Sequence, residues 1–247
     1  MTDSLPAVPA QQLALNIFEE YGIAEVRVTD VPVDFGYSKS EALINLADLG
    51  LMTRKAINAI HFIASEDPFR KHWDCDVGYF QWLANSGGTR NDKHGRQALR
   101  EAQKADIQVS VVDAQDPAKD IYGSVPLLGT FVLARGRLNF KLPEEISRLL
   151  KKPTDAVYLS LRIGGAFSSG YALGLYERLL QVRDAGGTEW MPIDEVREWF
   201  KATDRKSLQE YKFFKRDVLK PAVEQINDIS DIFVTIEEQR EKRRVVA

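Results

Sequence analysis

The chain has 247 residues, of which 44% are hydrophobic and 28% are charged. This composition supplies enough apolar material for one large or two modest cores and argues against a disordered chain. It contains no apolar run of about 18 residues, no basic-then-apolar leader and only one cysteine, so we expect a cytoplasmic protein without membrane spans or disulfides.

The net charge of −3 hides an uneven distribution. Residues 1–50 carry eight acidic and two basic side chains, a local net charge of −6, so the rest of the chain carries +3. A charge asymmetry of this kind indicates a charged partner better than the total does.

Apolar periodicity predicts the elements of the first half in chain order. We expect helices over 13–23, from Ser40 onward, and over 53–67, 77–88, 89–107 and 143–152. A strand is expected at 108–114, and residues 124–142 alternate in two halves about Arg135-Gly136, which predicts a hairpin.

The second half begins with a mixed connector at 156–170, in which GGAFSSG (164–170) is typical of a flexible linker. Helices are expected over 171–184, 191–202 and 207–228, and residues 231–247 predict a strand, a charged turn and a strand. Because Pro221 lacks a backbone N–H, we expect a kink or break at Lys220.

The two halves share one order of elements, namely a short aromatic helix, a polar turn, a basic helix and alternating strands. This order is the plan of a winged helix, so the predicted fold is α+β with two tandem winged-helix domains, each a helix-turn-helix plus a β-ribbon. We expect an N-terminal extension at 1–36, an N-terminal winged-helix domain at 37–155 for phosphate contact or dimerisation, and a C-terminal winged-helix domain at 156–247 for DNA recognition.

The helix at 89–107 has a basic stripe opposite a small apolar one. Its apolar side carries Ala98, Leu99 and Ala102. Its basic side carries Arg90, Lys93, Arg96, Arg100 and Lys104. Two interpretations stay open: a plain solvated helix face, or a face that contacts the phosphates of nucleic acid.

The helix at 207–228 has a sharper division. Its buried stripe is predicted at Tyr211, Phe214, Val218, Ala222 and Ile226. The candidate DNA-binding residues on and around its outward side are Lys206, Gln209, Lys212, Phe213, Lys215, Arg216 and Lys220. An exposed phenylalanine among cations is unusual for a plain surface but suits contact with a thymine methyl group or a sugar.

Roles follow from side-chain chemistry. Arg216 is the candidate for bidentate guanine readout and Gln209 for a polar base contact. Lys206, Lys212 and Lys215 are expected to contact phosphates. The triplet Lys242, Arg243 and Arg244 is either a wing tip on the DNA backbone or a basic tail.

Catalytic chemistry finds no support in the sequence. There is no GxxxxGK[ST] loop, no GxSxG motif and no histidine pair for a nicking site. Asp74 and Asp76 are interpreted as part of a surface loop and His61 as a core residue. We therefore expect no enzymatic activity, no metal and no cofactor.

Three segments resemble the iteron-binding plasmid replication initiators, the Rep proteins of theta-replicating bacterial plasmids. They are YALGLYERLL (171–180), YKFFKRDVLKPAVEQIND (211–228) and DIFVTIEE (231–238). The residues that meet the family pattern are Tyr171, Ala172, Leu175, Tyr176, Glu177, Phe214, Val218, Leu219, Pro221, Ala222, Ile226 and Asn227. Looser similarity in the first half extends the resemblance to about residues 40–247.

The resemblance implies an initiator of plasmid replication in the bacterial cytoplasm. Its C-terminal domain would read repeated origin sequences (iterons) in double-stranded DNA. Its N-terminal domain would touch the adjacent backbone in the monomer and form the interface of a dimer. The family also implies origin melting, contacts with host DnaA and a DnaB-type helicase, and plasmid copy control through the monomer–dimer equilibrium.

Two other functions remain as alternatives to the initiator. One is a tandem winged-helix transcriptional repressor, which would use the same DNA-binding surfaces at a promoter. The other is a nucleic-acid enzyme with nicking or priming activity.

Overall fold

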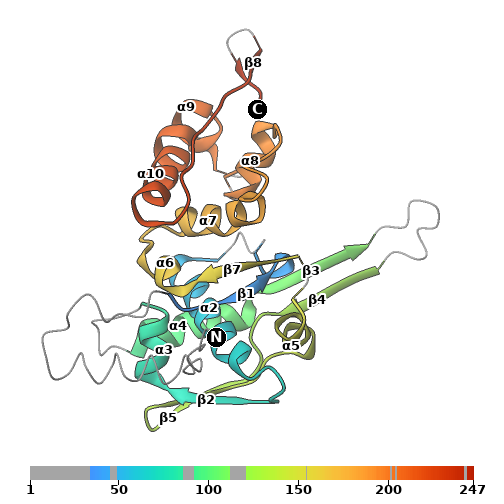
Figure 1. Ribbon diagram of the computed structural model, residues 1–247, viewed down its shortest axis with the longest axis vertical. Helices are drawn as coiled ribbons and strands as arrows, with labels where there is room; N and C mark the ends of the chain where they lie inside the picture. The colour runs from blue at the N-terminus through green and yellow to red at the C-terminus, as the bar shows by residue number, and fades with distance from the viewer. Residues whose placement is uncertain are drawn as a thin grey trace, which may run out of the picture.

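The computed structural model describes residues 34–44, 49–85, 92–111, 121–153, 155–200, 202–203, 205–241 and 244–247. The helix expected at 13–23 and nearly all of the predicted extension at 1–36 lie outside these residues. Figure 1 shows two groups of elements, one around α2 and the strands, and one formed by α7 to α10 and the last ribbon.

The first group is built around α2 (Leu51–Glu66). Apolar spacing predicted one core-facing side, but every residue from Thr53 to Ala64 is buried, so α2 is the central helix. Among the helices that pack on it are α3 (Val77–Leu83), α4 (Asp92–Lys104) and α5 (Glu144–Lys151).

The strands of this group form small antiparallel sheets. β1 (Gly36–Ser40) pairs with β7 (Ala156–Ser160), and β3 (Asp106–Val111) pairs with β4 (Ile121–Pro126). A three-stranded sheet has the order β2 (Trp73–Asp76), β6 (Arg137–Phe140), β5 (Phe131–Ala134). The predicted hairpin is confirmed, because β5 and β6 pair with each other. Its turn residues Arg135 and Gly136 both have positive φ, 51° and 76°.

The linker predicted at 164–170 is wrong over its first half. Gly164 and Gly165 lie in α6 (Leu161–Ala166) and are buried. The carbonyl of Gly165 accepts hydrogen bonds from Lys55 Nζ at 2.6 Å and from Asn85 Nδ2 at 2.7 Å. A Cβ at Gly165 would lie 3.1 Å from that of Asn85, so glycine serves close packing here and not flexibility.

The second group contains α7 (Gly170–Val182), α8 (Ile193–Trp199), α9 (Tyr211–Phe214) and α10 (Lys220–Ile229). The side chain of Ser169 accepts a hydrogen bond from the Ala172 N–H and so caps α7. Phe214 and Ile226 are fully buried, as the predicted stripe requires. The helix order α7, α8, α9–α10 is that of a helix-turn-helix unit.

The helix predicted at 207–228 starts later and does not break at Lys220. A separate 3₁₀ turn covers Lys206–Leu208, and the helix begins at Tyr211. Residues 215–219 form a π-helical turn, in which the Lys220 N–H donates to the Lys215 carbonyl five residues earlier. This wider turn precedes Pro221, which has no backbone N–H to donate to the helical ladder. Lys220 nevertheless keeps helical dihedrals, φ −62° and ψ −49°, so the chain stays helical where the break was predicted.

The last ribbon is shorter than predicted. Residues 232–239 have no ladder partner among the described residues, and only β8 (Arg240–Glu241) and β9 (Arg244–Val245) pair. The Gln239 N–H donates to the Ala247 carbonyl at 2.8 Å and extends the ribbon. The Ile193 N–H donates to the Val246 carbonyl at 3.0 Å, which ties the ribbon to the start of α8.

The fold is α+β with winged-helix units, as predicted. Their division at 155/156 stays a prediction. Below, the N-terminal unit means the described residues up to Ala166, because β7 and α6 pack on β1, α2 and α3, and the C-terminal unit means those from Phe167. None of the helices in the described ranges is both long and apolar enough to cross a membrane.

Candidate nucleic-acid interface

A groove of about 1200 Å³ opens on the C-terminal unit. Its walls are the start of α8, the outward side of α9 and the π-helical turn, and the residues around β8 and β9. The predicted DNA-binding residues that line it are Gln209, Lys212, Lys215, Arg216 and Lys220. The groove therefore joins most of the predicted recognition face to the ribbon.

The groove is rich in positive charge. Its lining contains six cationic side chains, Arg197, Lys212, Lys215, Arg216, Lys220 and Arg240, and two carboxylates, Asp194 and Glu210. A concave surface with this charge attracts a polyanion such as the phosphate backbone of a nucleic acid.

Arg216 lines the groove and contacts Phe213, which lies outside the groove lining. Phe213 is half-buried and not solvent-facing as predicted, because the Arg216 guanidinium lies over its ring at 5.0 Å. The Arg216 side chain is 62% exposed and donates to Asp217 at 2.5 and 2.8 Å. An exposed ion pair of this kind is weak, so the guanidinium can exchange Asp217 for an acceptor on a ligand.

Glu238 connects two parts of the C-terminal unit. One is the predicted recognition helix, formed by α9, the π-helical turn and α10, and the other is the ribbon formed by β8 and β9. Its carboxylate accepts hydrogen bonds from Tyr211 Oη at 2.7 Å, Lys215 Nζ at 2.6 Å and Arg240 Nη2 at 2.6 Å. The bond from Lys215, followed by those from Arg240 and Tyr211, lowers the pKa of Glu238 to about 2. Lys215, predicted to contact phosphate, is thus held by a carboxylate that also positions Arg240.

This cluster predicts an acid-sensitive ribbon. The depressed pKa means that Glu238 stabilises the fold above its ordinary value of 4.5, and that this stability is lost as pH falls toward 2. Glu238→Gln should unfold at a lower temperature than wild type at pH 7, and the difference should shrink below pH 4.5. Thermal unfolding followed by circular dichroism between pH 2 and 7 measures both curves, with exposed Glu237→Gln as the matched control. A constant difference between Glu238→Gln and wild type across that range would refute the clamp.

Arg197 lines the groove and was not selected from the sequence. Its side chain is only 9% exposed, and it donates to Asp194 at 2.6 Å and to the Gln209 carbonyl at 2.7 Å. It thereby ties α8 to the segment that leads into the recognition helix. The sequence carried one sign of it, the Asp194–Arg197 spacing of three residues on a helix.

The other predicted residues have varied surroundings. Gln209, predicted to contact a base, donates its side-chain amide to the Thr203 carbonyl. Lys220 Nζ lies 3.5 Å from Glu224, whereas exposed Lys212 forms no ion pair within the part of the chain that the structure describes.

The remaining predicted residues of the C-terminal unit lie outside the groove lining. Lys206 is exposed on the 3₁₀ turn. Lys242 and Arg243 lie outside the described residues, and Arg244 is described only as part of β9. Whether this triplet is a wing tip or a basic tail therefore stays an open prediction.

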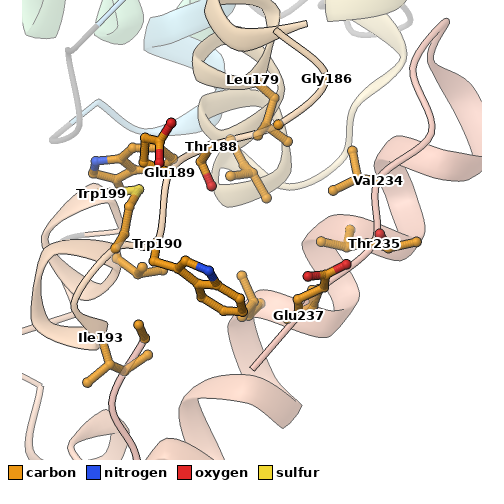
Figure 2. Close-up of a pocket in the computed structure, with 18 of the residues that line it drawn as sticks. Leu179, Gly186, Thr188, Glu189, Trp190, Ile193, Trp199, Val234, Thr235 and Glu237 are labelled. Carbon is orange, nitrogen blue, oxygen red and sulfur yellow. The ribbon is translucent and has the colours of Figure 1, made fainter. Parts of the chain in front are cut away.

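A second, smaller cavity of about 370 Å³ lies on the inner side of the extended segment at 232–239 (Figure 2). Trp190, Trp199, Leu179 and Val234 line it together with other apolar side chains. Of the described residues around it, two are glutamates and none is lysine or arginine. Its chemistry does not suit phosphate, so the cationic groove is the candidate interface.

α4 provides a second basic face, on the N-terminal unit. Ala98, Leu99 and Ala102 are buried against the core. The exposed basic residues of this face are Lys93, Arg96, Arg100 and Lys104, whereas Arg90 lies outside the described residues. Glu101 of the same helix accepts hydrogen bonds from Thr53 and Gln97, which lower its pKa. Its carboxylate is therefore charged and offsets part of the positive charge of this face.

The α4 face leads to a salt-dependence prediction. Lys93→Ala and Arg100→Ala should each weaken binding of specific and random duplexes equally, because phosphate contacts carry no sequence information. Each substitution should flatten the slope of log K against log salt by about one unit. Fluorescence anisotropy from low to high salt measures the slope, with Arg70→Ala, another exposed arginine of the N-terminal unit, as control. Unchanged slopes would leave α4 as a plain solvated face.

The residues considered for a metal site have structural roles. Asp74 and Asp76 lie on β2 and not in a surface loop, because their neighbour Cys75 faces the core between them. Asp76 caps α3 by accepting from the Gly78 N–H at 2.7 Å, and Asp74 pairs with Arg137 at 2.5 Å. Within the described ranges no group of three or more histidine, cysteine or acidic residues could hold a metal ion.

His61 is a core residue, as predicted. It is fully buried, and burial lowers its pKa to about 3, so it is neutral at physiological pH. Its Nε2 lies 3.4 Å from the Leu127 carbonyl.

A family model and solved structures match this chain, whereas curated proteins do not. The family model described as "Initiator Rep protein, WH2" matches residues 192–247, which contain every residue that lines the cationic groove. Among solved structures, the chain is similar to the Pi initiator protein, described in a crystal structure in complex with iteron DNA. The TM-score is 0.59 and the identity 17%, over 85% of this chain and 92% of that chain. No curated protein matches the sequence.

The fold and the groove define a protein built from tandem winged helices. The match over 192–247 places a second winged-helix domain of the initiator type at its C-terminus. Residues 192–247 match the Rep initiator family, in agreement with the resemblance of the sequence to the iteron-binding plasmid replication initiators.

Proposed function

We propose that this protein is a sequence-specific double-stranded DNA-binding initiator of plasmid replication that recognises repeated origin sequences. The observation that carries the proposal is the cationic groove of the C-terminal unit, lined by one face of the recognition helix and by the ribbon. The family match over the same residues and the fold shared with the Pi initiator protein support it.

The groove offers both kinds of contact that specific binding needs. A major groove of B-DNA, about 12 Å wide, admits an α-helix, and α9 with its π-helical turn exposes Lys212 and Arg216 on one side. Arg216 is the base reader, since a guanidinium donates two parallel bonds to guanine. Lys206, Lys212, Lys220 and Arg240 hold the backbone on either side, and Lys215 joins them when a phosphate displaces Glu238.

The N-terminal unit contributes a backbone contact through α4 in the monomer. Its Lys93, Arg96, Arg100 and Lys104 neutralise phosphates next to the segment that the C-terminal unit reads. The proposed role also includes self-association in a dimer and origin melting. It further includes recruitment of host DnaA and a DnaB-type helicase, as the family resemblance suggests. The protein acts in the bacterial cytoplasm by binding, without catalysis of its own.

Electrophoretic mobility shift with the repeat array of the plasmid that encodes the protein tests this function. We expect a ladder of complexes, one per repeat, at concentrations at least about 1000-fold below those that shift a scrambled duplex at the same salt concentration. Equal binding of the array and the scrambled duplex would refute the proposal.

The alternatives give different results in related experiments. A transcriptional repressor would protect a single promoter site in a footprint and leave the repeat array unprotected. A nicking or priming enzyme would release or extend a strand when incubated with origin DNA, nucleotides and Mg²⁺. We expect protection of the repeats and unchanged strands.

A further inference from the structure

Three polar side chains of the N-terminal unit converge on one carboxylate of the C-terminal unit. Glu177 of α7 accepts hydrogen bonds from Lys39 Nζ of β1 at 2.9 Å, from Arg54 Nη1 of α2 at 2.8 Å and from Asn58 Nδ2 of α2 at 2.7 Å. Tyr37 Oη lies 3.4 Å from Asn58 Oδ1 and extends the network. We call these four hydrogen-bonded residues, Lys39, Arg54, Asn58 and Glu177, the interdomain cluster.

The interdomain cluster is withdrawn from solvent. The side chains of Glu177 and Lys39 are 0% and 1% exposed, and that of Arg54 is 4% exposed. Burial by itself raises the pKa of Glu177, but Lys39, Arg54 and the bond from Asn58 outweigh it and lower the pKa below its ordinary value. The carboxylate is therefore charged, and it depends on donors from the other unit.

Buried charged groups of this kind favour one geometry more than they favour stability. Apolar residues of similar volume often support a fold equally well, because they avoid the cost of desolvating charges. A charge cluster differs because its members must meet at hydrogen-bond distance and angle. An orientation that moves the two units apart takes these donors away from Glu177.

The two helices that carry Glu177, Arg54 and Asn58, α7 and α2, also approach each other closely at this contact. On α7 the residues at the contact are Gly170, Gly174 and Glu177, spaced four and three apart on one face. A Cβ at Gly170 would lie 3.3 Å from the Leu51 backbone nitrogen, and one at Gly174 would lie 3.4 Å from the Arg54 guanidinium. The glycines allow the close approach that the bonds to Glu177 require.

α2 connects this contact to the basic face of α4. Thr53, next to Arg54 in the sequence, donates its hydroxyl to Glu101 of α4. On the other side, Tyr176, next to Glu177, donates to Asp231 at the end of α10 at 2.9 Å. Two adjacent residues on each helix therefore link α4, α2, α7 and α10 in one series of contacts.

We propose that Glu177 is a positioning residue which, through the interdomain cluster, holds the α4 face and the cationic groove at one separation, so that the protein selects DNA by the spacing of two contacts as well as by base sequence. The inference rests on the proposed DNA binding. It adds a specificity determinant 34 residues before Tyr211, where the recognition helix begins, and outside both DNA-contacting surfaces.

The test compares duplexes that differ only in spacing. A duplex selected by the wild-type protein from a random pool is mapped by hydroxyl-radical footprinting. About five base pairs, half a helical turn, are then inserted between the segments protected by the two units. Wild type should bind the insertion duplex on the order of 100-fold more weakly, because rigidly linked contacts cannot both be made out of phase.

Two variants remove the positioning in different ways. Glu177→Gln keeps the shape but leaves Lys39 and Arg54 buried without a carboxylate, which can compromise folding. The triple variant Lys39→Met, Arg54→Leu, Glu177→Leu replaces the charges by apolar groups and is expected to fold. In the triple variant the penalty for the insertion should fall to a few-fold, and its affinity for a short duplex with only the C-terminal segment should match wild type.

A distance measurement tests, without DNA, whether the interdomain cluster fixes the separation of the two units. Nitroxide labels at Lys71→Cys and Glu198→Cys, both exposed and outside the two DNA-contacting surfaces, report the separation of the units by electron–electron double resonance. Native Cys75 is buried, and burial raises the pKa of its thiol to about 12, so it competes little for the label. We expect one narrow distance in wild type and a broad distribution in the triple variant.

The outcomes separate the two proposals. A wild-type protein that selects no duplex would refute the proposed function, and the spacing inference with it. If wild type binds but the triple variant keeps both the narrow distance and the 100-fold discrimination, the spacing inference alone is overturned.

Discussion

Arg216→Ala is expected to cost about 1–3 kcal/mol in binding of the selected duplex and almost nothing in binding of a random duplex. Arg216 is 62% exposed, has the Phe213 ring beneath it and forms an exposed ion pair with its sequence neighbour Asp217. A guanidinium in this setting can turn to guanine without dismantling the fold. Anisotropy titrations of both duplexes at one salt concentration measure the two losses.

A matched control separates readout from general charge. Arg148 of α5 is similarly exposed, at 69%, and is paired with Glu144 at 2.7 Å, but it lies on the N-terminal unit away from both basic faces. Arg148→Ala should change neither affinity. Equal losses on specific and random DNA for Arg216→Ala would make Arg216 a phosphate contact and move base readout to another residue of the groove.

Phe214→Ala should destabilise the C-terminal unit by about 3–5 kcal/mol, while Phe213→Ala should cost much less. The two phenylalanines are adjacent, but Phe214 is 0% exposed and Phe213 is half-buried beneath Arg216. Phe214 packs edge to face with Phe200 at 5.6 Å and lies 5.9 Å from the Arg197 guanidinium. Its removal leaves a cavity beneath the recognition helix and removes the ring contact of Arg197.

Urea unfolding of both variants measures the difference in the free energy of unfolding. DNA binding distinguishes the two variants in a second way. Phe213→Ala should stay folded but bind specific DNA more weakly, because it removes the ring that supports Arg216. Equal destabilisation by the two substitutions would contradict the burial of Phe214 and the orientation of the helix.

Local patterns were sufficient to predict much of the fold. Apolar spacing located α2, α3 and the recognition helix, and alternation about Arg135-Gly136 located the β5–β6 hairpin. These signals work because side-chain periodicity and turn geometry act over a few neighbouring residues. The glycines of α6 show the limit, since the same residue type serves flexible linkers and close packing. Only contacts with Lys55 and Asn85, 110 and 80 residues away, distinguish the two roles.

The candidate interface also has one part that the local sequence pattern predicts and one part that it does not. The exposed cations of the recognition helix follow from its periodicity, since the buried stripe of Phe214, Val218 and Ile226 fixes the opposite side. The interactions of Lys215 and Arg216 do not follow from periodicity. Lys215 meets Glu238, 23 residues later, and the resulting clamp was not visible in the pattern of either segment.

By itself, the sequence determined the helical faces, the hairpin, the sign of the charge on two helices and the family resemblance, because each depends on residues close together in the chain. The tertiary structure alone decided that Glu177, Lys39 and Arg54 share one buried site and that Arg197 and Arg240 join the recognition helix in one groove. The physical reason is sequence separation. Lys39 and Glu177 are 138 residues apart, and only the packing of α7 on α2 and β1 brings a charge to its partner across that distance.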